Sequence, residues 1–453
     1  MIAVLGGGIS GLAAAYQLQK KGQDFILLEA DAELGGKIKS REVKGYTFEL
    51  GPNTVLINNP EIKALIADLG LESEIILPDK EAVKNRFVLK NGKIEAIPNS
   101  LSTAWKSKLF QLSTFLKVLQ EPLKAQKKNG EEESLADFAR RRFGNQIYQD
   151  FITPFITGIY AGDPEKMSIN HTLSILKEAE DKHGSVVKGM MKIIKEKKAQ
   201  NEIHQLPKQK IFTFKKGLAR LIEALSSAIG PKIETEAMVE SIRQNGKRYE
   251  VYYKQEGEVK SIVVDRLIST LPAPSLSFLI KNMDENLGAE LKKVNYVPAV
   301  ITHFGFPKTA HQFQQKAFGI LSRKEEQVPF LGLLFNSHFF PDHAPEQKEL
   351  ITVISGGYRQ PDLINKEESK IIGEIQNSLR ELIALSDQVD FTHVYKWPKA
   401  IPQFEMGHQA ILDQIEKFET NHPNFYIRGN FTQGISVSDC IANSAKLVDK
   451  LYP

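Results

Sequence analysis

Six residues near the start of the chain, Gly6 to Gly11, constrain its fold more than any other segment. They satisfy the pattern G-x-G-x-x-G. The loop follows an apolar run, Ile2–Leu5, that predicts a buried strand, and it precedes Leu12–Lys20, whose apolar spacing predicts a helix. A second apolar run, Phe25–Leu28, predicts the next strand. We therefore expect a βαβ unit, the start of a Rossmann-type α/β fold, at the beginning of the chain.

The glycines of this loop suit a diphosphate. Gly6 permits a tight turn off the strand, Gly8 lets the backbone approach a pyrophosphate, and Gly11 allows the helix to pack close to the strand. Ile9 and Ser10 lie where the helix begins, and the free N–H groups and positive dipole end of a helix attract phosphates there. An ordinary glycine turn is the alternative, and the surrounding strand and helix argue against it.

An acidic residue stands where a dinucleotide-binding fold needs one. Glu29 ends the second strand, about 20 residues after the loop, where a carboxylate accepts hydrogen bonds from ribose hydroxyls. Ala30 follows it and is placed in the same predicted contact. An acid here disfavours NADP, because its extra phosphate would be repelled.

The bulk composition limits the class of protein. With 453 residues the chain is too long for one small core, so we expect two or three domains. A net charge of +4 is too balanced to indicate nucleic-acid binding. No apolar run reaches membrane-spanning length, and the N-terminus lacks a signal-peptide pattern. A single cysteine, Cys440, excludes an intrachain disulfide, no histidine spacing suggests a metal site, and a cytoplasmic location fits.

The character of the chain changes along its length. Residues 99–211 are dense in Lys and Glu and predict helices at Trp105–Lys128, Leu135–Ile156 and Ile175–Lys198. Strands then return, with Leu218–Ile229 as a helix between them. A separate antiparallel sheet is predicted from Val297–Phe306, Phe318–Phe335 and Leu350–Ser355, and a following helix from Glu367–Leu385. Near the C-terminus we expect a strand at Phe425–Arg428, then a loop, then a helix at Cys440–Leu451. Between the first strands and this sheet, Arg248–Tyr253 and Ser261–Ser269 are predicted as two strands around a turn.

This pattern predicts a mixed α/β and α+β protein whose dinucleotide-binding domain is assembled from separated segments. We assign residues 1–84, 212–275 and 396–453 to that domain. Residues 85–98 and 276–395 would form the domain with the antiparallel sheet, and residues 99–211 a helical insertion.

Later glycine segments distinguish FAD from NAD as the dinucleotide. Leu34-Gly35-Gly36-Lys37 comes soon after Glu29, and a glycine pair followed by a cation suits a loop lying over a diphosphate. Phe48 to Asn53 is a second such segment, and Tyr426 to Val437, near the C-terminus, is a third. Together they resemble the glutathione-reductase-type FAD proteins of the amine oxidase superfamily.

The resemblance implies a set of FAD contacts in addition to the first loop and Glu29. It implies that the C-terminal glycine segment covers the flavin ring and that the last helix points its N-terminus at the ring, where a helix dipole would stabilise the anionic reduced flavin. A plain helix cap is the alternative for that segment. The implied contacts are Gly35, Gly36, Lys37, Gly51, Pro52, Asn53, Val239, Thr270, Gly429, Asn430, Ile435 and Val437.

Beyond these segments, the chain resembles the protoporphyrinogen oxidases of haem synthesis and the related coproporphyrinogen III oxidases over most of its length. The most specific block is Phe151 to Pro164. Further blocks are Glu49–Pro52, Asn85–Phe87, Asn91–Lys93, Ile97–Pro98, Phe214–Leu218, Ser269–Pro272 and Gly434–Ile441. The helical insertion matches the membrane-associating domain of that family, and the separate sheet matches its substrate domain.

Three residues are implied to contact the substrate. Arg86 matches an arginine that pairs with a porphyrin propionate, and a guanidinium fork suits a carboxylate. Thr157 and Ile159 lie in the block that lines the substrate cavity of the family. A surface arginine and an ordinary apolar core remain the alternatives. Asn53 stands where some relatives have a basic residue, so we assign it no substrate contact.

Two departures argue against other oxidases of the superfamily. Flavin amine oxidases carry a lysine on the strand that corresponds to Val300–His303, and here we place Thr302 at that position. Members with covalent flavin carry a cysteine before the flavin loop, whereas Cys440 lies beyond it and is expected to be packed.

The implied reaction is FAD-dependent oxidation of protoporphyrinogen IX to protoporphyrin IX, with coproporphyrinogen III oxidation as the alternative. Two electron-rich pyrroles activate each meso C–H, so hydride loss to flavin N5 gives a delocalised cation without a strong base. We therefore name no catalytic residue and expect three two-electron steps, with flavin reoxidised by oxygen or another acceptor. Peripheral membrane contact and a homodimer are compatible with the sequence.

Functions of other classes stay open. One is oxidation of an amine or a carotenoid-type lipid, against which the missing lysine and Arg86 argue respectively. The other is a non-enzymatic FAD-binding or assembly protein, which turnover would distinguish.

Overall fold

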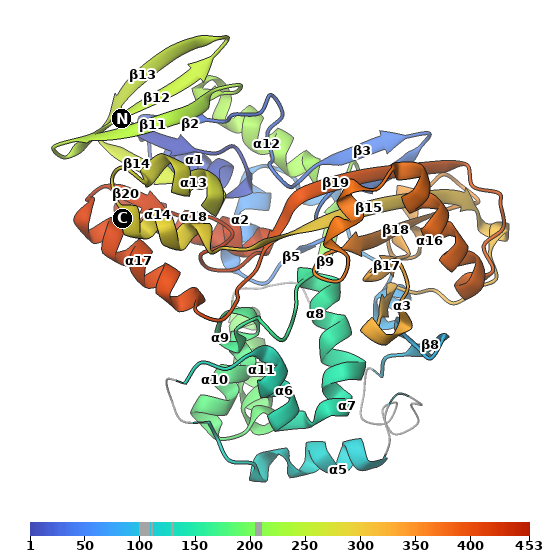
Figure 1. The fold of residues 1–453 in the computed structure, drawn as a ribbon. Helices are drawn as coiled ribbons and strands as arrows, with labels where there is room; N and C mark the ends of the chain where they lie inside the picture. The colour runs from blue at the N-terminus through green and yellow to red at the C-terminus, as the bar shows by residue number, and fades with distance from the viewer. Residues whose placement is uncertain (99–108, 110–111, 128–130, 204–210) are drawn as a thin grey trace.

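The structure is a computed structural model that describes residues 1–98, 109, 112–127, 131–203 and 211–453. Two sheets lie side by side, and a group of helices lies below them (Figure 1). The two termini both lie beside the smaller of these sheets. Part of the helix predicted over Trp105–Lys128 falls outside the described residues, and the described part forms α5 (Leu112–Gln120) and a short 3-10 turn (Glu121–Leu123).

The first sheet is parallel and has the glycine loop at its centre. Its strand order is β10 (Ile233–Glu234), β2 (Phe25–Leu28), β1 (Ile2–Leu5), β14 (Arg266–Ser269) and β20 (Phe425–Ile427). Every neighbouring pair is parallel, as expected for a sheet with both faces covered. The strands come from the start, the middle and the end of the chain, which agrees with the predicted assembly from separated segments.

Alternation along β1 explains why both faces of this sheet are buried. Ile2 and Val4 face a layer of three helices, α1 (Ile9–Lys20), α12 (Ala219–Ile229) and α18 (Val437–Leu451). Ala3 and Leu5 face the opposite layer. That layer contains a three-stranded antiparallel meander and three helices: β11 (Met238–Asn245), β12 (Arg248–Gln255), β13 (Glu258–Val264), α13 (Ala273–Ile280), α14 (Glu285–Lys292) and α17 (His408–Asn421).

One predicted strand is divided in the structure. The run Ser261–Ser269 was expected as a single strand, but it belongs to two different sheets. β13 ends at Val264 and β14 begins at Arg266, with Asp265 between them. Asp265 is exposed and bonds the N-terminal ammonium, so a charged residue marks the point where the chain leaves the meander.

The second sheet has seven strands. Its order is β19 (Phe391–Pro402), β15 (Tyr296–Pro307), β18 (Lys348–Gly356), β17 (Gly332–Leu334), β16 (Gly319–Ser322), β7 (Arg86–Lys90) and β8 (Lys93–Ala96). Neighbours are antiparallel, as predicted, except for the parallel pair β16 and β7. The run Phe318–Phe335, expected as strand, contains two short strands with a 3-10 turn, Lys324–Glu326, between them.

A single long helix covers one face of the second sheet. Ile371, Ile375 and Leu379 of α16 (Glu368–Ile383) pack against Val300 and Phe304 of β15. The other face is therefore free to meet the helical group and the segments that lead to the parallel sheet (Figure 1).

The helical group contains the remaining long helices. It comprises α5, α6 (Leu135–Phe143), α7 (Asn145–Ile147), a π-helical turn (Tyr148–Ile152), α8 (Thr153–Tyr160), α9 (Ile169–Thr172), α10 (Ser174–His183) and α11 (Val186–Ile203). The helix predicted over Ile175–Lys198 breaks at Gly184, which has a φ of +73° and ends α10.

Short elements connect these three parts. They are β3 (Ser40–Val43), β4 (Tyr46–Glu49), β5 (Val55–Leu56), α2 (Pro60–Asp68), β6 (Ile75–Ile76), α3 (Lys80–Lys84), β9 (Ile211–Phe214) and α15 (Asn336–Phe339). In addition, α8 contacts the second sheet directly, because Gly158 leaves room for the side chain of Leu321 on β16.

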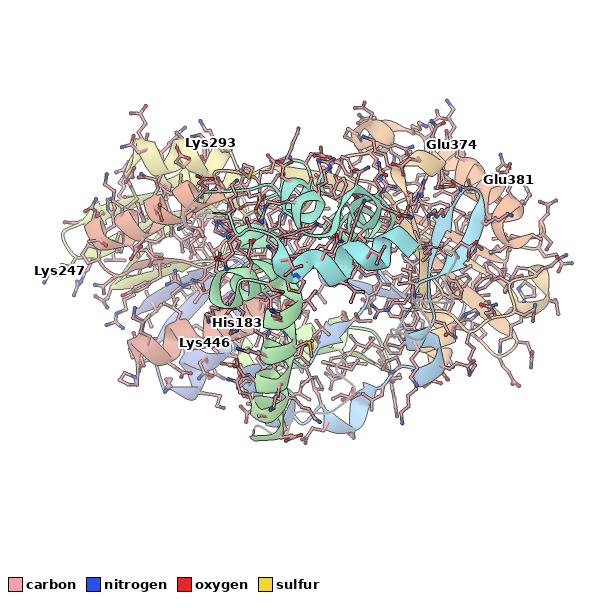
Figure 2. All side chains as sticks on the ribbon, turned by 90° about the horizontal axis from the view of Figure 1, so that it is seen from below. His183, Lys247, Lys293, Glu374, Glu381 and Lys446 are labelled. Carbon is pink, nitrogen blue, oxygen red and sulfur yellow. The ribbon has the colours of Figure 1, made fainter. Side chains whose placement is uncertain are left out.

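Charged side chains of both signs cover the outside. Seen from below, Lys247 and Lys293 point outward at one end, and Glu374 and Glu381 at the other (Figure 2). Among the described residues, no helix combines the length and the apolar character that a membrane span requires.

Candidate functional site

The glycine loop joins β1 to α1 by a very close approach of two backbone segments. A Cβ atom on Gly11 would lie 1.8 Å from the carbonyl oxygen of Gly6, so no other residue fits there without a shift of the backbone. Gly6 has a φ of +102° and donates its N–H to the Leu28 carbonyl at 2.8 Å. The loop therefore has the geometry that the sequence predicted.

The start of α1 keeps unpaired N–H groups. The helix begins at Ile9, Gly8 is its cap and has no capping side chain, and the first turn carries no acidic residue. Leu12 is the first residue to bond back to the loop, at 3.0 Å from the Gly8 carbonyl oxygen. The N–H groups around Ser10 can therefore bind an anion.

Thr270 closes the loop from behind. Its hydroxyl donates to the Leu5 carbonyl oxygen at 2.9 Å, and the Gly6 carbonyl oxygen lies at 3.2 Å. Its backbone N–H also bonds Leu5, at 2.8 Å. A residue from the middle of the chain thus holds the first loop in place.

A second glycine loop faces the first. The N–H of Gly35 donates to the Gly7 carbonyl oxygen at 2.9 Å, and Gly8 and Gly35 form an isolated β-bridge. A Cβ on Gly36 would lie 3.2 Å from the Cα of Gly8, so side chains here would fill the space between the loops. The two loops form a backbone cradle of the kind that a diphosphate needs.

Lys37 directly follows the second glycine pair and carries a cation. Its Nζ lies 3.8 Å from the centre of the Trp397 ring, and no described carboxylate lies within ion-pair distance. Burial, together with repulsion from Lys39, lowers the pKa of Lys37 to about 8. A bound anion would stabilise this cation and raise its pKa.

Glu29 already has backbone partners. Its carboxylate accepts hydrogen bonds from the N–H groups of Gly7 and Asp31, the latter at 2.8 Å. Lone pairs remain for a ribose hydroxyl, because each carboxylate oxygen accepts more than one bond. Ala30, the next residue, is exposed. The N–H of Ala237 donates to the Glu29 carbonyl oxygen at 2.8 Å, so the start of β11 and its half-buried Val239 lie close by.

The segment from Glu49 to Asn53 connects the cradle to the second sheet. A Cβ on Gly51 would lie 2.0 Å from the Lys37 carbonyl oxygen, and the indole N–H of Trp397 bonds the Leu50 carbonyl. Pro52 and Asn53 are half-buried. Asn53 accepts a hydrogen bond from the amide of Asn336 at 3.0 Å, a partner that the sequence did not indicate because α15 lies almost 300 residues away.

Glu49 has a structural role that sequence reasoning missed. Its carboxyl group is only 1% exposed and accepts from the Ser40 hydroxyl at 2.7 Å and from the Leu218 N–H at 2.8 Å. Burial raises the pKa of Glu49 to about 8. The buried carboxyl group therefore links β3 to the start of α12.

The C-terminal segment ends in a capped helix. Gly429 and Asn430 follow β20, and α18 begins at Val437, with the Ser436 hydroxyl accepting from the Asp439 N–H at 3.1 Å. Ile435, just before the cap, is half-buried. The helix start lies where the sequence predicted it, but its first turn also holds the Asp439 carboxylate.

Cys440 is packed inside α18. The residue is buried, and this burial raises the pKa of the thiol to about 11. The thiol is therefore neutral near pH 7 and is a weak nucleophile, as the sequence led us to expect.

The three predicted substrate residues lie around β16. Arg86, the first residue of β7, pairs in register with Gly319, so its side chain shares a face with Leu321, two residues along. Leu321 in turn packs on Gly158 of α8. The two neighbours of Gly158 in the chain are Thr157, which is buried, and Ile159, which is 45% exposed. The structure thus brings Arg86 and α8 to the same face of the sheet.

Arg86 has no carboxylate partner among the described residues. Its guanidinium carbon lies 5.0 Å from the centre of the Phe318 ring, and its side chain is exposed. A cation held over an aromatic ring and left without an acid can take an anion from solution.

Thr302 does not lie on this face. It is fully buried and shares the α16 side of β15 with Val300 and Phe304, whereas Ile301 and Ala299 face Trp397. The assignment of Thr302 to the amine oxidase lysine position stays a prediction, because the strand alternates and the sequence alone does not fix which face is which. No lysine occurs on either face of Val300–His303.

Histidine near this face is neutral. His303 is fully buried, bonds the Thr352 hydroxyl at 3.0 Å, and has its pKa lowered to about 3 by burial. No group of three or more His, Cys, Asp or Glu side chains in the described part of the chain could hold a metal ion. The site therefore consists of a backbone cradle for an anion, an apolar sheet face and unpaired cations.

Comparison with known proteins finds relatives that match almost the whole chain. A sequence profile described as "Flavin containing amine oxidoreductase" matches residues 9–445. The chain is 30% identical to the chloroplastic protoporphyrinogen oxidase 1 of Arabidopsis thaliana, over 97% of this chain and 85% of that protein. It is 26% identical to the coproporphyrinogen III oxidase of Bacillus subtilis, over 97% and 95% of the two chains.

Solved structures show the same fold. A crystal structure from Exiguobacterium sp. 255-15, provisionally described as a protoporphyrinogen oxidase, superimposes with a TM-score of 0.84 at 20% identity and covers 100% of this chain and 98% of that one. A reduced UDP-galactopyranose mutase superimposes with a TM-score of 0.75 at 16% identity, over 99% and 95% of the two chains. At these identities the likeness extends to the fold alone.

The close approach at the first loop gives a stability prediction. Gly11→Ala places a methyl group against the Gly6 carbonyl, and overpacking of this kind costs at least about 1–3 kcal/mol. We expect Tm in a thermal melt to fall by several degrees. The matched control is Gly373→Ala in α16, where the added methyl meets open space and Tm should be unchanged or higher.

Glu49 gives a pH-dependent prediction. Its folded pKa, about 8, lies above the usual 4.5, so its contribution to stability is complete below pH 4.5 and is lost as pH rises through 8. Glu49→Gln imitates the protonated carboxyl group, so this loss, on the order of 4 kcal/mol, should disappear. Urea unfolding should show that the free energy of unfolding of the variant, relative to that of the wild type, is higher at pH 8.5 than at pH 5. An unchanged difference between the two proteins would contradict this account.

Proposed function

The chain belongs to the family of flavin-containing amine oxidoreductases, and from this premise we propose that it oxidises protoporphyrinogen IX to protoporphyrin IX in haem biosynthesis, with coproporphyrinogen III as the alternative substrate. It is a flavin-dependent oxidoreductase whose cofactor is FAD. The observation that carries the choice of substrate is the unpaired guanidinium of Arg86 on the face that β16 shares with α8. The relatives include protoporphyrinogen oxidases and coproporphyrinogen III oxidases, and both support a porphyrinogen as the class of substrate.

The residues of the cradle fit FAD. The unpaired N–H groups at the start of α1 and the facing glycine loops would hold its diphosphate, Glu29 its ribose, and the segments at Gly51–Asn53 and Gly429–Val437 its ring system. Val239 and Thr270 would support the same cofactor from β11 and β14. When bound, FAD supplies the two-electron acceptor for each step.

The chain's own contribution is positioning. Arg86 would fix a propionate of the substrate, and Thr157 and Ile159 would form part of the wall against the flat tetrapyrrole. The described residues of this region offer no obvious base. His303 stays neutral, because burial lowers its pKa to about 3. None is required, because two pyrroles activate the meso C–H that loses hydride.

We also propose a division of labour along the chain. Residues 1–84, 212–275 and 396–453 would bind FAD, residues 85–98 and 276–395 the substrate, and residues 99–211 would form the helical part.

The helix α5 and the turn after it expose Leu116, Leu119 and Leu123 at 52%, 74% and 85%, beside Lys117. This pattern supports peripheral contact with an anionic membrane surface. We propose oxygen as the electron acceptor. A homodimer is proposed as well, and size-exclusion chromatography would test it.

The central experiment is turnover of the two substrates. Purified protein should be yellow and should convert protoporphyrinogen IX into a fluorescent porphyrin with consumption of oxygen. Faster conversion of coproporphyrinogen III would favour the alternative. Protein that binds FAD but makes no porphyrin from either substrate would refute the proposal.

Arg86 should control substrate affinity. Arg86→Gln removes a charged hydrogen bond worth about 1.5–3 kcal/mol, so KM should rise roughly tenfold or more. Arg380→Gln is the matched control, because Arg380 is exposed on α16 and pairs with Asp387. An unchanged KM in Arg86→Gln would remove the propionate role.

Lys37 should make FAD affinity depend on pH. The pKa of Lys37, about 8 before the cofactor binds, rises when the diphosphate is beside it, so affinity is full below pH 8 and falls as pH rises above it. Fluorescence titration with FAD at pH 7 and pH 9.5 should show this fall in the wild type. Lys37→Arg, which stays charged, should show little pH dependence, and Lys37→Met should bind weakly at both values.

A further inference from the structure

Arg359 lies in a tight turn that is fixed to the end of α8. The turn follows β18 through Gly356 and Gly357, which have φ values of +86° and +60°. A Cβ on Gly357 would lie 2.5 Å from the Ala161 carbonyl oxygen, and the Tyr358 N–H donates to the same oxygen at 2.9 Å. The backbone of Arg359 is therefore held rigidly beside α8.

The guanidinium of Arg359 is held by neutral groups. Its Nη1 donates to the Ser322 hydroxyl at 2.9 Å, and its Nη2 donates to the Ser322 carbonyl oxygen at 2.9 Å and to the Thr157 hydroxyl at 3.2 Å. Its Nε is buried and has no acceptor in the structure. The Tyr358 side chain also bonds the guanidinium, so the Nε–H is the group that is left without an acceptor.

No carboxylate lies within ion-pair distance of Arg359 among the residues that the structure describes. Three other half-buried or buried arginines have one: Arg142 pairs with Glu121, Arg220 with Glu74, and Arg323 with Asp150. The half-buried Arg266 also lacks one and lies over the Tyr452 ring. A partly buried cation without a counter-charge is unfavourable, and it gains most when an anion reaches it.

The position of Arg359 relative to Arg86 suggests which anion this is. Arg86 lies opposite Gly319 at the start of β16, and Arg359 binds Ser322 at its end. Gly319 and Ser322 are three positions apart along the strand, roughly 10 Å. Two cations without acids therefore mark the two ends of one strand, and α8 packs on the strand between them.

We propose that Arg359, positioned by Ser322 and Thr157, binds a second propionate of the tetrapyrrole, at the opposite end of β16 from Arg86. This inference rests on the proposed function, because the anion is a carboxylate of the porphyrinogen. Both candidate substrates carry at least two propionates, so both can use the site. Arg86 and Arg359 together would fix the macrocycle at two points and prevent it from rotating in its plane.

The test compares Arg359→Gln with the wild type on both porphyrinogens and on a porphyrinogen whose carboxyl groups are methyl esters. KM for the free acids should rise roughly tenfold, while kcat changes less than about twofold and the flavin absorbance spectrum stays the same. On the ester, wild type and variant should have equal KM, since no carboxylate remains to bind.

Two further variants keep the test decisive. Arg359→Lys keeps the charge but loses the planar fork, so its KM should fall between those of the wild type and Arg359→Gln. Arg243→Gln is the matched control, because Arg243 lies over Tyr252 on β11, outside this region, and its KM should equal the wild-type value. If Arg359→Gln does not fold, Arg359→Lys on acid and ester decides the question.

The outcomes separate the two proposals. Wild-type protein that makes no porphyrin would overturn the proposed function and this inference with it. Active wild type with an unchanged KM in Arg359→Gln, or an equal rise in KM on acid and ester, would overturn only the second carboxylate site and leave Arg359 a structural role.

Discussion

The contact between two glycine loops is the constraint on which the rest of the structure depends. Gly7 and Gly35 are joined by a backbone hydrogen bond, and a Cβ atom on either of these two glycines would lie 2.6 Å from its nearest neighbour. Because this cradle is made of backbone, its shape depends on what lies behind it. Thr270 holds the first loop, and Gly51 packs against the backbone of Lys37. The cofactor site is therefore a product of the whole assembly and not of its first loop alone.

Much of this assembly follows from local patterns in the sequence. The strand, glycine loop and helix at Ile2–Lys20 could be predicted because sterics and periodicity are local, and the same holds for the strand at Phe425. The division at Asp265 and the phase of Thr302 could not be predicted, since apolar runs that are buried on both faces carry no alternation.

The parts of the site that escaped prediction depend on distant partners. Arg359 is bound by Thr157, which lies 202 residues away, and Glu49 accepts from Leu218, 169 residues away. Arg359 stands in no motif, and Glu49 belongs to the block Glu49–Pro52 without any sign there that its carboxyl group is buried. Only the fold shows that one is a cation without an acid and the other a buried carboxyl group. The glycine-rich segments identify the cofactor, whereas unpaired charges, which appear only after folding, point to the substrate.

The order of strands in the parallel sheet has a consequence for how the chain folds. β20 and α18 come from the last 30 residues, yet β20 pairs with β14, which itself pairs with β1, and α18 packs on α1. Contacts between the two ends of a chain close late and slowly. While the chain folds, β14 therefore leaves an exposed edge of the sheet until β20 has paired with it. The glycine loop beside β1 thus lies early in the chain, yet the sheet around it is complete only after β20 has joined.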